Sequence, residues 1–495
     1  MKNIKLRPEF LLPLIVALTA LRPGDGSWLN DEPIMMEMAL RYNRTASTIY
    51  GFYLPFTPCP FGLEGTRGAR YGPLPVWIDQ VLLAFSHDLR VILALHALLF
   101  ISITVMAVYW LTRTLRMSPW FAIVTLLSPW LWLFSRSLWD STWCIPIAAV
   151  LFAAYAAFLA NPSAPLLCLT LFCLILIPLV HLMAIAMVLP VGIHLLIFHR
   201  RRLWQWKWSA LAIIAACAYL FFPYLIFFFT HTRPEVAPRH SPLLGWLFPL
   251  LGGHYLTLGV AGTMPGDGWQ DYAPIFLRQF LFPAAQWIAR LALIAVWLGM
   301  ALAIPRAWKA LRRPADASPL HSLCLIALAV WICQTVLDGI ERIYFSPNYY
   351  AATWIVYVFF AWTAVDWLLR PSAGINLAIR WSLAVYAASL LLGIVIIAAT
   401  IARNAGTVGP YYGATLANQI QAVEKIERFS DRSGFDVQFP LWRLQPLAFQ
   451  VLMELNPPSA GPRPLANLVV KYRHAYPGDA RIEVQALPLP VPPRG

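Results

Sequence analysis

Long apolar stretches separated by short polar segments run through the chain as far as about residue 401. A helix that crosses a bilayer needs ~20 mostly apolar residues, or ~17 when it is short. By this criterion the pattern predicts a bundle of about eleven transmembrane helices. Their approximate ranges are 10–21, 91–111, 120–134, 143–159, 165–180, 182–198, 210–229, 287–304, 323–336, 350–369 and 381–401.

Two loops of this bundle, 22–90 and 230–286, are too long to be simple connectors. Within the first loop, segments 33–42 and 75–85 interleave apolar and polar residues, which predicts juxtamembrane helices lying at the membrane surface. We therefore expect the loops to form a working surface.

Hydrophobicity falls after residue 401, and a tail of different character begins. Residues 414–429 have the pattern of an amphipathic helix, whereas 467–474 and 481–487 alternate like strands. The Pro-rich end, 488–495, is typical of disorder. The sequence thus predicts a transmembrane domain over 1–403 and a small α/β domain over 404–495.

Composition supports the membrane interpretation. Of 495 residues, 59% are hydrophobic and 12% charged, which excludes an ordinary soluble protein and a disordered one. The 7 cysteines show neither a disulfide framework nor a metal-ligand spacing.

The formal charge of +14 has a topological explanation. Basic residues gather on alternate loops, as they do on the cytoplasmic side of membrane proteins, so no nucleic-acid partner is needed to explain them. This places the N-terminus in the cytoplasm and the tail outside. The inward residues are Lys2, Lys5, Arg7, Arg113, Arg116, Arg200, Arg201, Arg202, Lys207, Arg306, Lys309, Arg312, Arg313, Arg370 and Arg380.

Charged side chains beside apolar spans are costly, so the few at the outer ends suggest a site. Asp31-Glu32 follows the first span, although it also fits the capped start of a helix. Arg136 and Asp140 follow the third span, where an i,i+4 ion pair is the alternative. Arg90 opens the second span, where snorkelling would account for it.

Two further groups lie at the same predicted outer level. Asp338 to Tyr344 follows the ninth span, and His181 separates the fifth and sixth spans, where hydrogen-bonded structure is its simpler explanation. Carboxylates, arginines and aromatic rings gathered at one membrane face suit a substrate with a lipid tail and a polar head.

Several short motifs occur in an order similar to that of a known family. They are Asp31-Glu32 leading to Ala39, the segment Tyr71-Gly72-Pro73-Leu74-Pro75-Val76-Trp77, Arg90, Ser135-Arg136 with Asp140, Glu341-Arg342-Ile343-Tyr344 with Tyr349-Tyr350, and Gly409-Pro410-Tyr411-Tyr412-Gly413-Ala414-Thr415. The pattern resembles the GT-C-fold glycosyltransferases that use polyprenyl-phosphate-linked sugars. Protein O-mannosyltransferase-like and lipid A aminoarabinose transferase-like members are the most similar. The chain departs from the pattern where relatives often carry lysines, at Tyr71 and His181.

The resemblance implies a GT-C-like fold and roles for the outer residues. Asp31 would be the general base, with Glu32 positioning and Asp140 orienting an arginine or helping to hold a metal. Cations would meet the donor phosphate, and Tyr71, His181, Tyr344 and Tyr349 would bind substrate. The candidate cations are Arg70, Arg90, Arg136 and Arg342.

The same resemblance implies the partners. The donor would be a sugar on a polyprenyl phosphate and the acceptor a protein, lipid or glycan, with transfer at the outer face of a bacterial inner membrane and inversion at the anomeric carbon. No nucleotide is required, and a divalent metal ion stays open because some relatives carry one and others do not.

Two other classes compete with this hypothesis. A lipid or polysaccharide transporter would line a pathway with its intramembrane charges, although no half-to-half repeat is visible. A membrane-anchored assembly protein is the third class, and the long, polar first loop argues against it.

Overall fold

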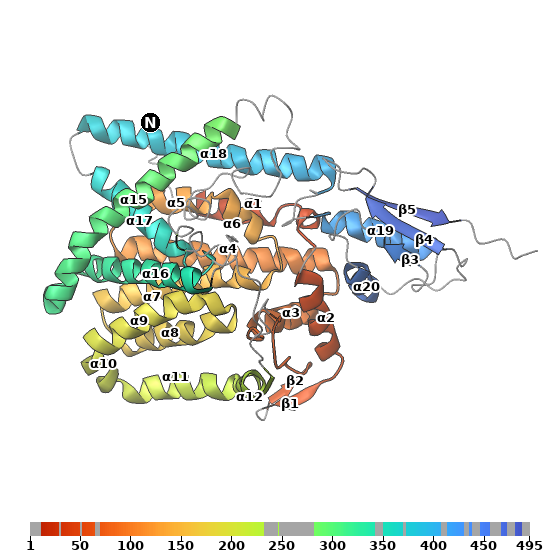
Figure 1. Ribbon diagram of the computed structural model, residues 1–495, viewed down its shortest axis with the longest axis horizontal. Coiled ribbons are helices and arrows are strands. Elements are labelled where there is room, and N and C mark those ends of the chain that lie inside the picture. Colours follow the sequence, from red (N-terminus) through yellow and green to blue (C-terminus); the bar gives the residue numbers. More distant parts are fainter. Residues whose placement is uncertain are drawn as a thin grey trace, which may run out of the picture.

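The computed structural model describes residues 11–28, 31–49, 52–64, 70–231, 246, 282–341, 350–369, 373–406, 413–429, 435–437, 446–455, 467–472 and 481–487. A helical bundle makes up most of the molecule, and a small α/β unit lies at one end of its long axis (Figure 1). The long helices are α4 (Leu89–Thr114), α7 (Cys144–Ala160), α15 (Phe282–Arg312), α16 (Pro319–Glu341) and α18 (Ala373–Asn404).

Fewer helices can cross a membrane than the sequence predicts. By length and composition, 5 helices of the described residues qualify, or up to 6 if one bent pair counts as a single span. They indicate a helical membrane protein, but the expectation of about eleven spans is wrong. The qualifying ranges are Leu89–Thr114, Asp140–Ala160, Ala292–Arg312, Pro319–Ile340 and Ile379–Asn404.

Proline accounts for part of the difference. The apolar stretch 120–134 is divided into α5 (Pro119–Leu126) and α6 (Pro129–Phe134), because Pro129 lacks the N–H that would continue the first helix. The stretch 210–229 becomes α11 (Lys207–Leu220) and α12 (Phe222–His231), which bend by 61° next to Pro223.

The remaining apolar stretches form short helices that fill the bundle. They contain 10 to 17 residues, fewer than the ~20 that a helix usually needs to cross a hydrocarbon core about 30 Å thick. They are α1 (Leu11–Ala20), α8 (Ala164–Leu176) with its 3-10 extension Ile177–Leu179, α9 (Ile185–Phe198) with the preceding turn Leu182–Ala184, and α17 (Trp354–Leu368).

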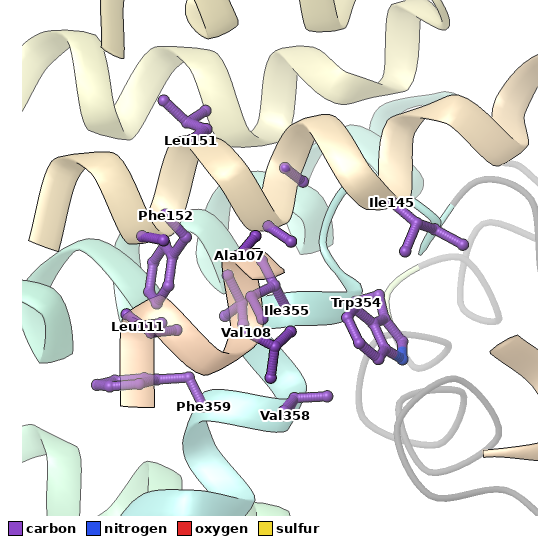
Figure 2. Close-up of a cluster of buried hydrophobic side chains, with 14 of the residues drawn as sticks. Ala107, Val108, Leu111, Ile145, Leu151, Phe152, Trp354, Ile355, Val358 and Phe359 are labelled. Carbon is purple, nitrogen blue, oxygen red and sulfur yellow. The ribbon is translucent and has the colours of Figure 1, made fainter. Parts of the chain in front are cut away.

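The main core lies where α4, α7 and α17 meet (Figure 2). Val108 of α4, Phe152 of α7 and Phe359 of α17 are fully buried there. On the other side of α17, Gly299 of α15 lies against its backbone, since a Cβ at that position would fall 1.8 Å from the Phe360 carbonyl oxygen. The absence of a side chain therefore lets α15 and α17 pack closely.

The end of the bundle next to the α/β unit carries the first loop. Helices α2 (Asp31–Asn43) and α3 (Leu74–Phe85) confirm the predicted helices at 33–42 and 75–85. The sequence did not predict the hairpin between them, in which β1 (Ser47–Ile49) pairs with β2 (Phe52–Leu54). The second long loop lies outside the described residues over 232–245 and 247–281.

The tail combines helices with a sheet, as predicted. Helix α19 (Leu416–Phe429) and strands β4 (Asn467–Tyr472) and β5 (Ile482–Leu487) confirm three predicted elements. The sheet has the order β3-β4-β5; β3 (Phe435–Val437) is parallel to β4, and β5 is antiparallel to it. Helix α20 (Pro446–Leu455) and β3 were not predicted, and 488–495 lies outside the described residues.

The tail shares one hydrophobic core with α2 and α3. Trp28 is fully buried, and its indole N–H donates to the Ala448 carbonyl (3.1 Å). The side-chain amide of Gln419 donates to the Trp28 carbonyl (2.5 Å), and the backbone N–H of Leu416 donates to the Gly26 carbonyl (3.0 Å). Residues 26–28 are thus held by the tail.

Candidate functional site

Three predicted acidic residues come together at the end of the bundle that faces the tail. Asp31 and Glu32 open α2, and Asp140 opens the 3-10 turn Asp140–Trp143 that leads into α7. Ser137 donates to Glu32 Oε1 (2.8 Å), and the Trp139 indole N–H donates to Asp31 Oδ2 (2.6 Å). The segment 137–139, just before the 3-10 turn, therefore holds the first two carboxylates of α2.

The carboxylates differ in their access to solvent. Asp31 is half-buried, whereas Glu32 and Asp140 are each 3% exposed. Burial raises the pKa of Asp31, and the Trp139 hydrogen bond offsets part of that rise. Burial also raises the pKa of Glu32 to about 7, against the hydrogen bond from Ser137. Asp31 is therefore the accessible carboxylate of the pair, and Glu32 lies beneath it.

Asp140 completes this group from the 3-10 turn that precedes α7. Its Oδ1 accepts from the Ser141 amide (2.6 Å), and its Oδ2 is buried with no hydrogen-bond partner among the described residues. It lies within electrostatic reach of Asp31 and Glu32. Because a buried oxygen without a partner is costly, this arrangement favours a site that retains polarity for a purpose other than stability.

A fourth carboxylate, Asp79, was missed by the sequence analysis. It lies on α3, is 2% exposed, and its Oδ2 has no hydrogen-bond partner among the described residues. Burial raises its pKa well above the usual range, and the neighbouring Glu32 adds to the rise. The sequence did contain a signal, namely an aspartate inside the apolar stretch 74–85. The rule that a charge within an apolar segment suggests a functional site would have detected it.

Arg136 is held by the backbone at the end of α1. Its guanidinium donates to the carbonyls of Thr19 (3.1 Å), Leu21 (2.5 Å) and Arg22 (2.6 Å), and it is 2% exposed. Such an arrangement satisfies carbonyls that a helix end leaves without partners. Arg136 and Asp140 form no ion pair, so the alternative of a simple i,i+4 pair is not what the structure shows.

Arg70, Tyr71 and His181 form a second group beside the start of α3. The Tyr71 and His181 rings lie 4.6 Å apart between centroids, and Arg70 pairs with Glu64 at 2.5 Å. A Cβ on Gly72 would lie 2.2 Å from the Leu179 carbonyl oxygen, so this contact requires glycine. Burial lowers the pKa of His181 to about 4, which leaves the ring uncharged near neutral pH.

The other predicted residues are placed as follows. Arg90 pairs with Asp88, the N-cap of α4, at 3.2 Å, and its side chain is 54% exposed. Asp338 accepts from Gln334 (2.7 Å) and from the Tyr350 hydroxyl (2.8 Å). Arg342, Tyr344 and Tyr349 lie outside the described residues.

Within the described part of the chain, no group of three His, Cys, Asp or Glu side chains is arranged to hold a metal ion. Comparisons with protein families, with characterised proteins and with solved structures find no match for the chain.

Proposed function

We propose that this protein is an integral membrane glycosyltransferase that moves a sugar from a polyprenyl phosphate to a hydroxyl acceptor, with Asp31 as the general base. The observation that carries the proposal is the half-buried Asp31, held by the 2.6 Å bond from Trp139 and grouped with the buried carboxylates of Glu32 and Asp140. That bond engages Oδ2 and fixes the orientation of the carboxylate.

The location of the group suits a substrate with a lipid tail. The spans that begin at Leu89 and Asp140 start at this end of the bundle, so the carboxylates lie where membrane-crossing helices end. A donor whose lipid tail stays in the bilayer would present its phosphate and sugar at that depth. The proposed outer face of a bacterial inner membrane agrees with the basic residues at the opposite end.

The chemistry needs few groups. The acceptor oxygen forms a bond to the anomeric carbon, the bond from that carbon to the phosphate oxygen breaks, and the electron pair leaves with the polyprenyl phosphate. The acceptor proton passes to Asp31, whose raised pKa makes it a stronger base than an exposed aspartate. Direct attack inverts the anomeric centre.

A cation is expected to stabilise the departing phosphate. Arg70 and Arg90 suit this role better than Arg136, because each is partly exposed and held by a single carboxylate that a phosphate could replace. The guanidinium of Arg136 is engaged by three backbone carbonyls. Its proposed part is to fix the end of α1 beside the site.

The test is Asp31→Asn, assayed with purified protein and a panel of polyprenyl-phosphate-linked sugars. The amide still accepts from Trp139 but cannot take a proton, so transfer should fall by about 10²–10⁴-fold. Glu37→Gln is the matched control, since Glu37 is exposed on the same helix. Full transfer by Asp31→Asn would remove the base assignment, and transport of lipid or glycan by a wild-type protein inactive in transfer would favour the transporter class.

A further inference from the structure

A strongly basic surface lies at the end of the bundle opposite the carboxylates. It comprises two segments: residues 199–209, which contain α10 (Arg200–Gln205), and residues 306–313 at the end of α15. Helices α9 and α16 contact each other and bring the two segments to the same end of the molecule (Figure 1). We call this surface the basic end.

Among the described residues, no ion pair neutralises the positive charge of the basic end. Arg200, Arg201, Lys309, Arg312 and Arg313 are exposed, and within the described ranges none of them forms an ion pair. The ion pairs that the described residues form lie at the other end of the bundle and involve Arg22, Arg44, Arg70 and Arg90. The basic end therefore presents guanidinium and ammonium groups that an external anion can reach.

Tryptophans at the same level identify the kind of anion. Trp204 is 72% exposed, Trp208 74% and Trp308 52%. Lys207 Nζ lies 4.3 Å from the Trp204 ring centroid, and Arg312 Cζ lies 4.3 Å from that of Trp308. Large indoles exposed beside cations are typical of the depth at which lipid headgroups meet the hydrocarbon. Indoles at that depth favour an anion that belongs to a lipid headgroup.

We propose that the basic end binds the phosphate groups of anionic phospholipids. Two neighbouring arginines, Arg312 and Arg313, supply planar guanidiniums that match phosphate oxygens in pairs. Arg200 and Arg201 supply a second such pair from α10, and the tryptophans keep both pairs at headgroup depth. This inference does not depend on the sugar-transfer proposal.

The experiment compares lipid preference in nanodiscs that contain phosphatidylglycerol and phosphatidylcholine. Phosphatidylglycerol carrying a bromine-labelled acyl chain quenches tryptophan fluorescence when it lies beside Trp204, Trp208 or Trp308. The variants are Arg312→Gln/Arg313→Gln and Arg200→Gln/Arg201→Gln. At about 1 kcal/mol for each cation near an anionic surface, each double variant should lose about 30-fold in its preference for the anionic lipid.

The matched control is Arg41→Gln/Arg403→Gln, which removes the same charge from exposed positions outside the basic end. Arg312→Lys/Arg313→Lys keeps the charge and should retain most of the preference for the anionic lipid. If a glutamine variant does not fold, the lysine variant replaces it in the comparison with the wild type. An unchanged preference in both glutamine variants would overturn the proposal. An equal loss in the control would also overturn it, because the preference would then follow net charge and not this surface.

Discussion

Replacing Glu32 by glutamine tests the electrostatics of the carboxylate group most directly. Glu32 has a pKa of about 7 in the folded protein against an ordinary value of 4.5, and burial is the main cause. Between these two pH values the folded protein binds more protons than the unfolded chain. The contribution of Glu32 to stability is therefore greatest below pH 4.5 and falls as the pH rises to about 7.

The size of the effect follows from the two values. A difference of one pKa unit between the folded and unfolded states corresponds to about 1.4 kcal/mol. Titration of Glu32 alone therefore removes about 3 kcal/mol of unfolding free energy between pH 4.5 and 7. Glu32→Gln keeps an acceptor for Ser137 but cannot ionise. As the pH rises from 4.5 to 7, the unfolding free energy of the variant should therefore fall by about 3 kcal/mol less than that of the wild type. At pH 8 the variant should be the more stable protein.

Unfolding of the detergent-solubilised protein by heat and by denaturant at pH 5, 6, 7 and 8 measures this difference. Asp31 and Asp79 also have raised pKa values, so part of the pH dependence remains in the variant and keeps its sign. Glu37→Gln, an exposed change on the same helix, should behave as the wild type. A Glu32→Gln protein with the full wild-type pH dependence would refute the reasoning.

Three other perturbations have definite expected outcomes. Trp139→Phe removes the 2.6 Å bond that lowers the pKa of Asp31, so the acid limb of the pH–rate profile for sugar transfer should move to higher pH. Arg136→Gln leaves carbonyls at the end of α1 without their charged donor, and thermal unfolding should show a loss of about 3 kcal/mol or more. Gly72→Ala would place a Cβ 2.2 Å from a backbone oxygen and should cost about 1–3 kcal/mol in the same assay. Gly192→Ala is the control: a Cβ added at Gly192 would meet no atom of another segment within 4 Å, so this change should not destabilise the protein.

Sequence patterns predicted the local elements well but not how many of them cross a membrane. Helices were found in most predicted apolar stretches because hydrophobicity and helix propensity act over neighbouring residues. The span count failed at Pro129, which divides one stretch into two helices, and at short helices such as α17, which has 15 residues. A hydropathy window adds up apolar residues without asking where the backbone hydrogen bonds stop.

The candidate site was predicted in part. The charges at the ends of predicted spans led to Asp31, Glu32 and Asp140, which the structure brings together. The roles of individual side chains were harder to predict from the sequence, because they depend on partners far away in the chain. Arg136 binds carbonyls more than 100 residues earlier, and no local pattern distinguishes that role from phosphate binding.

By itself the sequence determined the class of the protein, the ends at which its charges gather, and the helix and strands of its tail, since each depends on composition or short-range periodicity. Only the tertiary structure decided that Asp79 lies near Glu32, and that Gln419 and Ala448 in the tail bind Trp28. The physical reason is that a hydrogen bond or a buried charge depends on which distant segments share a core. That choice is made by the packing of the whole chain.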